Sequence, residues 1–516
     1  MNGKIQLSRK DYKDKVYGCW LGKNIGGTLG APFECSKYVN NLTFYEPVPD
    51  KPLPNDDLDL QLVWLKMLED KNAEEPELGD FAEYWLKYLR AWPPDEYGFC
   101  LRNLERGLRP PISGCFENSC VDNMGSPIRS EIWGCIAPAD PQFAASLAIK
   151  DALLDHAGGE GVYGEMFWAA VESAAFVISD AKTLIRIGLS MIPLSCQISR
   201  VIRQVLWLYD NGVTWAEARN KIATLFSNPA PFIVVGGDNP FYNINWGGYV
   251  HPGYAPVNHG FTIIGWLYGK DFGDKLCKAV NCGYDTDCTG ATLGSVLGII
   301  EGAKNIPEKW RKPVGETIVL HKFTAPCDAP KTVKELTGRT EAIAAKFIRD
   351  KSDVVILGKE SSIPKDILSL LCRSEKAREA LSSYDIHSAI EIDKDLKITF
   401  HYNGEPVLYP GITKEVEISL KKNGKEIRKE AEVELKIPNT WKAEKKERFK
   451  FSLYSNDVKP RNEIKVEVKL DNRDYSSKFA ILGPQEAKGW PAELGVPTCP
   501  KCRARKEACI CEQGSE

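Results

Sequence analysis

The sequence predicts a multidomain protein with a helical region over residues 1–350, a helical connector over 351–392, an antiparallel β-sandwich over 393–484 and a short cysteine-rich tail over 485–516. In the first region, glycines recur every four residues and apolar residues recur at helical spacing. After Asp395, apolar and polar residues alternate in short segments that Asn-Gly turns separate. Helical spacing before this point and alternation after it indicate the change of domain.

The first helix is predicted to contain a ladder of four glycines: Gly18, Gly22, Gly26 and Gly30. Each glycine inside a helix costs about 1 kcal/mol relative to alanine, so the ladder needs a compensating contact. The simplest such contact is close approach of another helix backbone. The helix should end near Gly30, because Pro32 disfavours helical geometry at the residue before it. Glu34 then follows on a loop, where an isolated glutamate is ordinarily a surface acid.

Two acidic stretches, far apart in the chain, begin two further predicted helices. The first, at residues 55–59, precedes apolar residues at the spacing of one helical face. The second, at 285–289, precedes another glycine ladder over 290–302, which is the candidate partner of the first ladder. Either stretch alone is consistent with simple helix capping. Together they supply enough oxygen ligands for a hard cation such as magnesium, calcium or manganese.

The composition narrows the class of protein. The chain has 516 residues, a formal net charge of −3 and 16 cysteines. The balanced charge gives no case for a nucleic-acid or membrane partner, and no apolar run reaches the roughly 18 residues of a membrane helix. The polar N-terminus predicts no signal peptide. Cysteines scattered irregularly between Cys19 and Cys372 indicate reduced thiols in a cytoplasmic protein, with the oligomeric state left open.

Three segments carry a resemblance to a known family. They are GCWLGKNIGGTLGAPFE at 18–34, NDDLDLQLVWL at 55–65 and GYDTDCTGATLGSVLG at 283–298. They resemble signature segments of the ADP-ribosylglycohydrolase family, which includes the dinitrogenase-reductase-activating glycohydrolases and the ADP-ribosylhydrolases. The resemblance implies an all-α bundle with two Mg²⁺ ions, for which Mn²⁺ often substitutes. It also implies hydrolysis at the anomeric carbon of a ribosyl group, most often in ADP-ribose linked to a protein side chain.

The resemblance further implies which residues bind the metals. The family's two metal motifs, Thr-Asp-Asp and Asp-x-Asp-Thr, predict five ligands here: Asn55, Asp56, Asp57, Asp285 and Asp287. An amide at Asn55 and a thiol at Cys288 replace two threonines of the family pattern. The carbonyl oxygen of Asn55 can still bind a cation. A thiol is a poor partner for magnesium, so Thr289 or a water would complete that shell.

Two residues are expected to take part in the chemistry. Glu34 matches the glutamate that ends the family's first segment, and it is the candidate acid/base or substrate-orienting carboxylate. Asp287 is expected to orient the attacking water as well as to bind metal. Hydrolysis builds oxocarbenium character on the sugar, which nearby carboxylates stabilise, and a bound metal lowers the pKa of a water.

Two residues in the middle of the chain are candidate substrate contacts. His156 lies in a glycine-rich loop before a predicted helix, where related hydrolases carry a substrate-contacting histidine. A hydrogen-bonded loop anchor is an equally good interpretation of His156. Asn258 follows a turn-rich stretch and begins a predicted helix that leads toward the second acidic stretch.

The alternating segments after residue 393 predict a β-sandwich similar to the immunoglobulin-like modules that follow catalytic domains in some glycoside hydrolases. Packing or oligomer contacts are its expected role, and carbohydrate binding is the alternative.

The tail predicts a structural zinc site. Four thiolates suit tetrahedral zinc, and a reduced tail without metal is the alternative. The four cysteines are Cys499, Cys502, Cys509 and Cys511.

The sequence is compatible with three functions. The first is a metal-dependent ADP-ribosyl hydrolase acting on a small-molecule or protein-linked glycoside. The second is a metal-dependent glycosidase or nucleosidase that cleaves a different O- or N-glycoside on the same scaffold. The third is a non-catalytic protein that binds ADP-ribose or a nucleotide sugar. All four aspartates and Glu34 are present, which favours an enzyme.

Overall fold

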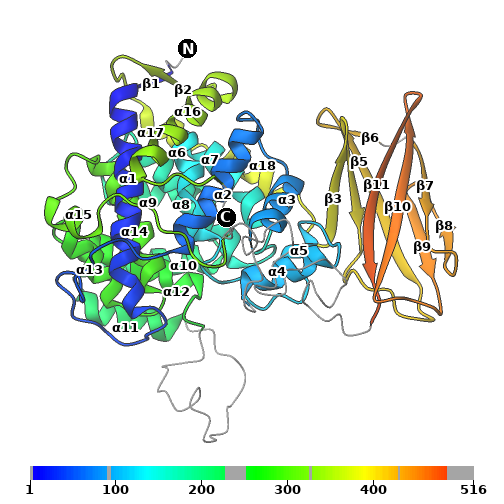
Figure 1. Cartoon of the computed structure of the whole chain (residues 1–516), viewed down its shortest axis with the longest axis horizontal. Coiled ribbons are helices and arrows are strands. Elements are labelled where there is room, and N and C mark those ends of the chain that lie inside the picture. Colours follow the sequence, from blue (N-terminus) through cyan, green and yellow to red (C-terminus); the bar gives the residue numbers. More distant parts are fainter. Residues whose placement is uncertain (1–3, 90–94, 227–250, 325–327, 428–429, 485–516) are drawn as a thin grey trace, which may run out of the picture.

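A helical region and a β-sandwich lie side by side in the computed structural model (Figure 1). This arrangement confirms the predicted fold class of a helical bundle followed by antiparallel strands. The cysteines of the predicted zinc tail lie outside the residues that the structure describes. The described residues are 4–89, 95–226, 251–324, 328–427 and 430–484.

The helices bury their apolar faces in one continuous core. The longer helices are α1 (Arg9–Gly30), α2 (Asp56–Asp70), α3 (Leu78–Tyr88), α4 (Glu96–Glu105), α7 (Pro141–Ala152), α8 (Glu160–Ala175), α9 (Ala181–Met191), α10 (Gln197–Asp210), α11 (Trp215–Leu225), α12 (Ala255–Tyr268), α13 (Phe272–Asn281), α14 (Thr286–Glu301) and α16 (Val333–Lys351). The shorter ones are α5 (Ile112–Cys115), α6 (Glu131–Ile136), α15 (Glu308–Val314), α17 (Ile367–Leu371), α18 (Glu375–Ser382) and the 3₁₀ turns η1 (Ala31–Phe33) and η2 (Pro127–Arg129).

Helices α1 and α14 pack against each other along their glycine ladders (Figure 1). A Cβ added at Gly18, Gly22 or Gly26 would collide with a carbonyl oxygen of α14, because the two backbones touch. The predicted partnership of the two ladders is therefore confirmed. Helix α1 also ends at Gly30, as the position of Pro32 predicts.

The region predicted as a helical connector contains two strands that the sequence did not indicate. Strand β2 (Val355–Gly358) pairs in parallel with β1 (Ile5–Ser8) on the helical region. Strand β3 (Ser388–Asp393) already belongs to the sandwich. Strand β2 has only four residues, and the first three residues of β3 are all buried, so neither strand shows a clear alternation of buried and exposed positions. The predicted helical content of the connector is present as α17 and α18.

The C-terminal region is a sandwich of two antiparallel sheets, as predicted. One sheet has the order β3-β4-β5-β9-β8, with β6 paired to β5, and the other has the order β11-β10-β7. Phe400 and Phe479, from opposite sheets, stack at 5.2 Å between ring centroids inside the shared core. The remaining strands are β4 (Leu396–His401), β5 (Lys414–Lys422), β6 (Lys425–Ile427), β7 (Glu432–Lys436), β8 (Lys442–Lys445), β9 (Lys450–Tyr454), β10 (Arg461–Leu470) and β11 (Arg473–Leu482).

The segment between α4 and α5 joins the two regions. Leu108 and Ile112 belong to the sandwich core, although they precede it by almost 300 residues. Arg109 donates to Glu391 on β3 at 2.9 Å. The sandwich is therefore docked on the helical region through apolar and charged contacts.

The described residues contain neither a membrane-spanning helix nor a disulfide. Among them, no helix has the length and apolarity needed to cross a bilayer. Their eleven cysteines are all free thiols, so no disulfide supports the described part of the fold.

Candidate functional site

The α1–α14 contact brings the first and third signature segments together. Where the ladders end, Thr286 donates its hydroxyl to the carbonyl oxygen of Gly30 at 2.8 Å. A Cβ at Gly30 would collide with the Thr286 backbone, so the start of α14 lies directly against the end of α1. The loop that carries Glu34 and the first turn of α14 therefore lie beside each other.

The first turn of α2 completes the site. Asn55 is the N-cap of α2, and its side-chain oxygen accepts the Asp57 backbone N–H at 2.7 Å. A Cβ at Gly27 would strike the Asn55 amide, so the glycine leaves room for this cap. Asp56 and Asp57 are thereby placed at the positive end of the helix dipole, which favours carboxylates.

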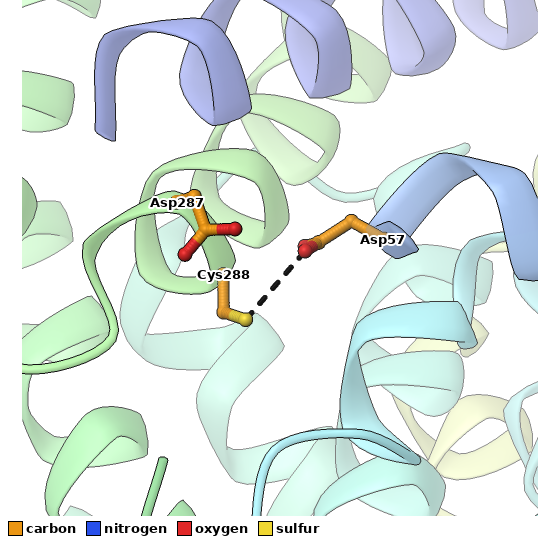
Figure 2. A group of neighbouring side chains, drawn as sticks. All are labelled: Asp57, Asp287 and Cys288. Carbon is orange, nitrogen blue, oxygen red and sulfur yellow. Dashed lines mark hydrogen bonds between the residues drawn. The ribbon is translucent and has the colours of Figure 1, made fainter. Parts of the chain in front are cut away.

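Three side chains from the two acidic stretches meet in the interior. Asp57, Asp287 and Cys288 offer ligand atoms within 4.8 Å of one another (Figure 2). The Cys288 thiol lies 3.5 Å from an oxygen of Asp57. Oδ1 of Asp287 is buried and has no hydrogen-bond partner among the described residues. An unsatisfied buried carboxylate oxygen is costly, and a bound cation would satisfy it.

A cavity of about 330 Å³ opens over this cluster. Tyr97, on α4, donates to Asp56 at 3.2 Å and so fixes one carboxylate at the wall. None of the described lining residues is lysine or arginine. The lining includes Glu34, Asp56, Asp95, Glu96, Tyr97, His251, Asp285, Asp287, Cys288, His321 and Phe323.

The carboxylates at the rim repel one another. Desolvation, followed by the charges of Asp285 and Asp56, raises the pKa of Glu34 to about 7. Burial is the main reason that the pKa of Asp285 rises to about 6, and the Asp56 charge adds to it. A group with a pKa near neutrality can both give and take a proton, which suits acid/base catalysis.

The two inner carboxylates are also hard to ionise. Burial raises the pKa of Asp57 well above its usual range, although the neighbouring Lys23 opposes the rise. Burial and the Glu34 charge raise the pKa of Asp287 in the same direction. Divalent cations bind ionised carboxylates, so a cation here would offset both the burial and the repulsion that raise these pKa values.

Asn258 lies beneath the site and is not among the residues that line the cavity. Its side chain donates to the carbonyl of Pro252 at 2.7 Å and accepts the backbone N–H of Asp285 at 3.2 Å. Asn258 is fully buried. Its contacts therefore position Asp285, which is the first residue of the second metal motif.

His156 lies elsewhere in the core. It is fully buried, it does not line the cavity, and its Nδ1 lies 3.0 Å from Asp155. Asp155 in turn pairs with the buried Arg129 at 2.6 Å. Both ring nitrogens of His156 are buried and make no hydrogen bond among the described residues, so neither a substrate contact nor a hydrogen-bonded loop anchor is seen there. Within the described part of the chain, no contact connects His156 with the carboxylate cluster.

A buried lysine that motif reading missed supports the α2 side of the site. Lys23 is only 1% exposed and donates to Glu131 at 2.7 Å and to the Ile128 carbonyl at 2.8 Å. Its Nζ lies 3.5 Å from Oδ1 of Asp57. Gln61 reinforces the group, because its amide donates to the second oxygen of Glu131 at 2.8 Å. A charged residue in the middle of an apolar, glycine-rich helix was the signal in the sequence.

Comparison with known proteins identifies the family. The model of the family described as ADP-ribosylglycohydrolase matches residues 8–344, which is more than half of the chain. An uncharacterized protein of Archaeoglobus fulgidus is 24% identical over 317 residues, covering 58% of this chain and 90% of the relative. A solved structure titled as an ADP-ribosylglycohydrolase-related protein complex is 19% identical, covers 65% of this chain and 98% of its own, and has a TM-score of 0.43. On the extent of the family match, the chain belongs to the ADP-ribosylglycohydrolase family and is a hydrolase of glycosidic bonds.

Proposed function

We propose that this hydrolase cleaves the bond at the anomeric carbon of ADP-ribose with the help of a dinuclear magnesium centre. The main support is the meeting of two acidic helix starts at one cavity, where a buried oxygen of Asp287 lacks a hydrogen-bond partner among the residues that the structure describes. Family membership supports a ribosyl substrate.

The donor set fits divalent cations. Four carboxylates would hold them: Asp56 and Asp57 in the first turn of α2, Asp285 at the N-cap of α14 and Asp287 in its first turn. The Asn55 oxygen already accepts one N–H, so Asn55 would contribute its second lone pair. When bound, such cations polarise ribose hydroxyls and lower the pKa of a coordinated water. Manganese suits the same oxygen ligands.

The chain's own residues perform the remaining steps. Glu34, at the rim of the cavity, would protonate the leaving group or take a proton from water, as its pKa of about 7 permits. Asp287 would orient the attacking water. The surrounding carboxylates would stabilise the positive charge that develops on the sugar ring.

Calorimetric titration of ADP-ribose into the full-length protein tests this proposal. The protein is stripped with a chelator, reloaded with magnesium or manganese, and compared with ribose and glucose as control ligands. We expect micromolar binding of ADP-ribose that disappears without metal. Loss of turnover in folded Glu34→Gln and Asp287→Asn variants would support the assigned roles. Binding without any turnover of an ADP-ribosyl substrate would instead support a non-catalytic binding protein.

A second substrate class is favoured by the lining of the cavity. ADP-ribose carries a negatively charged pyrophosphate, whereas the described lining is acidic and contains no lysine or arginine. A neutral O- or N-glycoside would avoid this repulsion. Release of free sugar from a panel of nucleosides and simple glycosides, with no ADP-ribose binding by the metal-loaded protein, would favour this alternative.

The remaining predictions concern location and the C-terminal regions. A cytoplasmic location is supported by the eleven free thiols of the described residues, since such thiols persist in a reducing compartment. A structural role for the sandwich is supported by its docking onto α5 and the segment that precedes it. Structural zinc in the tail remains a proposal from the cysteine spacing.

A further inference from the structure

The two places where a divalent cation could bind differ in what surrounds them. Glu34, Asp56 and Asp285 line the open cavity, with Asp285 9% exposed. Asp57 is fully buried and lies behind the cavity wall. We call the first place the outer position (Glu34, Asp56, Asp285) and the second the inner position (Asp57, Asp287, Cys288), whose ligand atoms lie within 4.8 Å of one another.

Both oxygens of Asp57 already have neighbours. Oδ1 lies 3.5 Å from the Lys23 ammonium, and Oδ2 lies 3.5 Å from the Cys288 thiol. A cation at the inner position would therefore find one oxygen turned toward a positive charge. It would also find a sulfur ligand where magnesium and manganese prefer oxygen.

Lys23 itself cannot leave. Its Nζ has three neighbours, the carboxylates of Glu131 and Asp57 and the Ile128 carbonyl, which match the three N–H donors of an ammonium. The side chain is 1% exposed, so water does not screen its charge. Glu131 holds the ammonium in its charged form at 2.7 Å, and Gln61 holds Glu131 in place. The positive charge beside Asp57 is thus a permanent part of the fold.

We propose that Lys23 makes the metal centre asymmetric: a divalent cation binds tightly at the outer position and weakly at the inner position. The fixed ammonium already supplies one positive charge beside Asp57, so a second cation there gains less attraction and meets repulsion. Lys23 is a positioning residue in this scheme, since it acts through Asp57. The inference rests on the proposed metal centre.

Titration with manganese alone provides the test. Mn²⁺ is added calorimetrically to the metal-stripped, full-length protein, and elemental analysis after dialysis gives the stoichiometry. We expect two binding events whose affinities differ by at least about tenfold, the usual effect of a charge within 4–6 Å on an ionic equilibrium. Lys23→Met should tighten the weaker event by about tenfold and leave the stronger event unchanged.

Two further variants keep the test decisive. Lys23→Met strands Glu131 in the core and could unfold the protein, so Lys23→Met/Glu131→Gln removes both charges together. The same tightening is expected in this double variant. Lys150→Met is the matched control, because Lys150 is also buried but pairs with Glu75 at 2.7 Å and does not line the cavity. It should change neither event.

The outcomes separate the inference from the proposal on which it rests. Two equal sites in the parent protein, or a weaker event that Lys23 variants leave unchanged or weaken further, would overturn the role of Lys23 while leaving the metal centre intact. Absence of any bound manganese in the parent protein would refute the metal centre itself. Tightening in the folded Lys23 variants, with Lys150→Met unchanged, would establish the asymmetry.

Discussion

The starts of α2 and α14 carry similar aspartates, but different groups pack against them. The α2 start is backed by a buried cation, since Lys23 lies between Asp57 and Glu131. The α14 start is backed by the bare backbone of α1, and an oxygen of Asp287 has no partner among the described residues. The acidic residues at a helix start therefore do not alone determine how strongly the site attracts a cation. A charged side chain packed against them changes the net negative charge that a ligand meets.

The largest expected effect is the loss of stability that follows from disrupting the backbone contact between α1 and α14. Gly22→Ala places a methyl group against the Gly294 carbonyl, where only backbone could yield. We expect destabilisation by roughly 4 kcal/mol or more, or failure to fold, measured by chemical denaturation. Gly79→Ala on α3 is the control, because nothing lies within 4 Å of its added Cβ. Equal stability of the two variants would contradict the close contact of the helices.

The next largest effect compares the two helix starts through matched substitutions at Asp287 and Asp57. Asp287→Asn should lower turnover by roughly 1,000-fold through loss of a charge at the reacting centre. In the metal-free protein the same change should raise stability by on the order of 1 kcal/mol, because it removes an uncompensated buried carboxylate. Asp57→Asn should stabilise less, since it also gives up the contact with Lys23. Thermal unfolding in chelator would show whether this order holds, and the reverse order would contradict the comparison.

A smaller effect is expected from pH. The folded-state pKa values of Asp285 and Glu34 are raised to about 6 and about 7. Their contribution to stability is therefore fully present below their unfolded pKa values near 4 and is lost as pH rises through about 6 to 7. Bound metal reverses this trend, because it favours the ionised form. The difference in melting temperature between metal-loaded and metal-free protein should widen from pH 5 to pH 8, and a constant difference would argue against the carboxylate ligands.

The smallest effect is expected far from both helix starts. Arg109→Ala removes the ion pair with Glu391, whose two side chains are 33% and 29% exposed, between the segment before α5 and the sandwich. We expect a loss of less than about 1 kcal/mol in stability and unchanged turnover. A clear fall in turnover of the folded variant would show that the sandwich influences the site.

Local spacing was sufficient to predict the scaffold of the site. Glycines at every fourth position predicted the α1–α14 contact, and Pro32 predicted where α1 ends. Alternation predicted β4, β5, β7, β9, β10 and β11 of the sandwich but not β2 or β3, which lack a clear alternation and pair with partners that the fold provides.

Contacts between distant segments could not be predicted in the same way. Lys23 and Glu131 are 108 residues apart, and nothing in the local pattern of either residue indicates the other. The loop around His156 left two interpretations open, a substrate contact and a loop anchor, and its burial beside Asp155, which pairs with Arg129, could not be predicted from that loop. Packing partners at long range, rather than periodicity, decide which polar residues reach the cavity.

The backbone contact of α1 and α14 also limits how the sequence can change over time. At most packed positions a larger residue on one side can be accommodated by a smaller one opposite. Here Gly18, Gly22 and Gly26 each meet a carbonyl oxygen, and the residue opposite is already glycine. No substitution on the opposite helix can create space for a larger residue, so a change in one ladder cannot be compensated by a change in the other. The glycines of the two helices are therefore expected to stay fixed, whereas the loops, the cavity rim and the added sandwich can change in sequence.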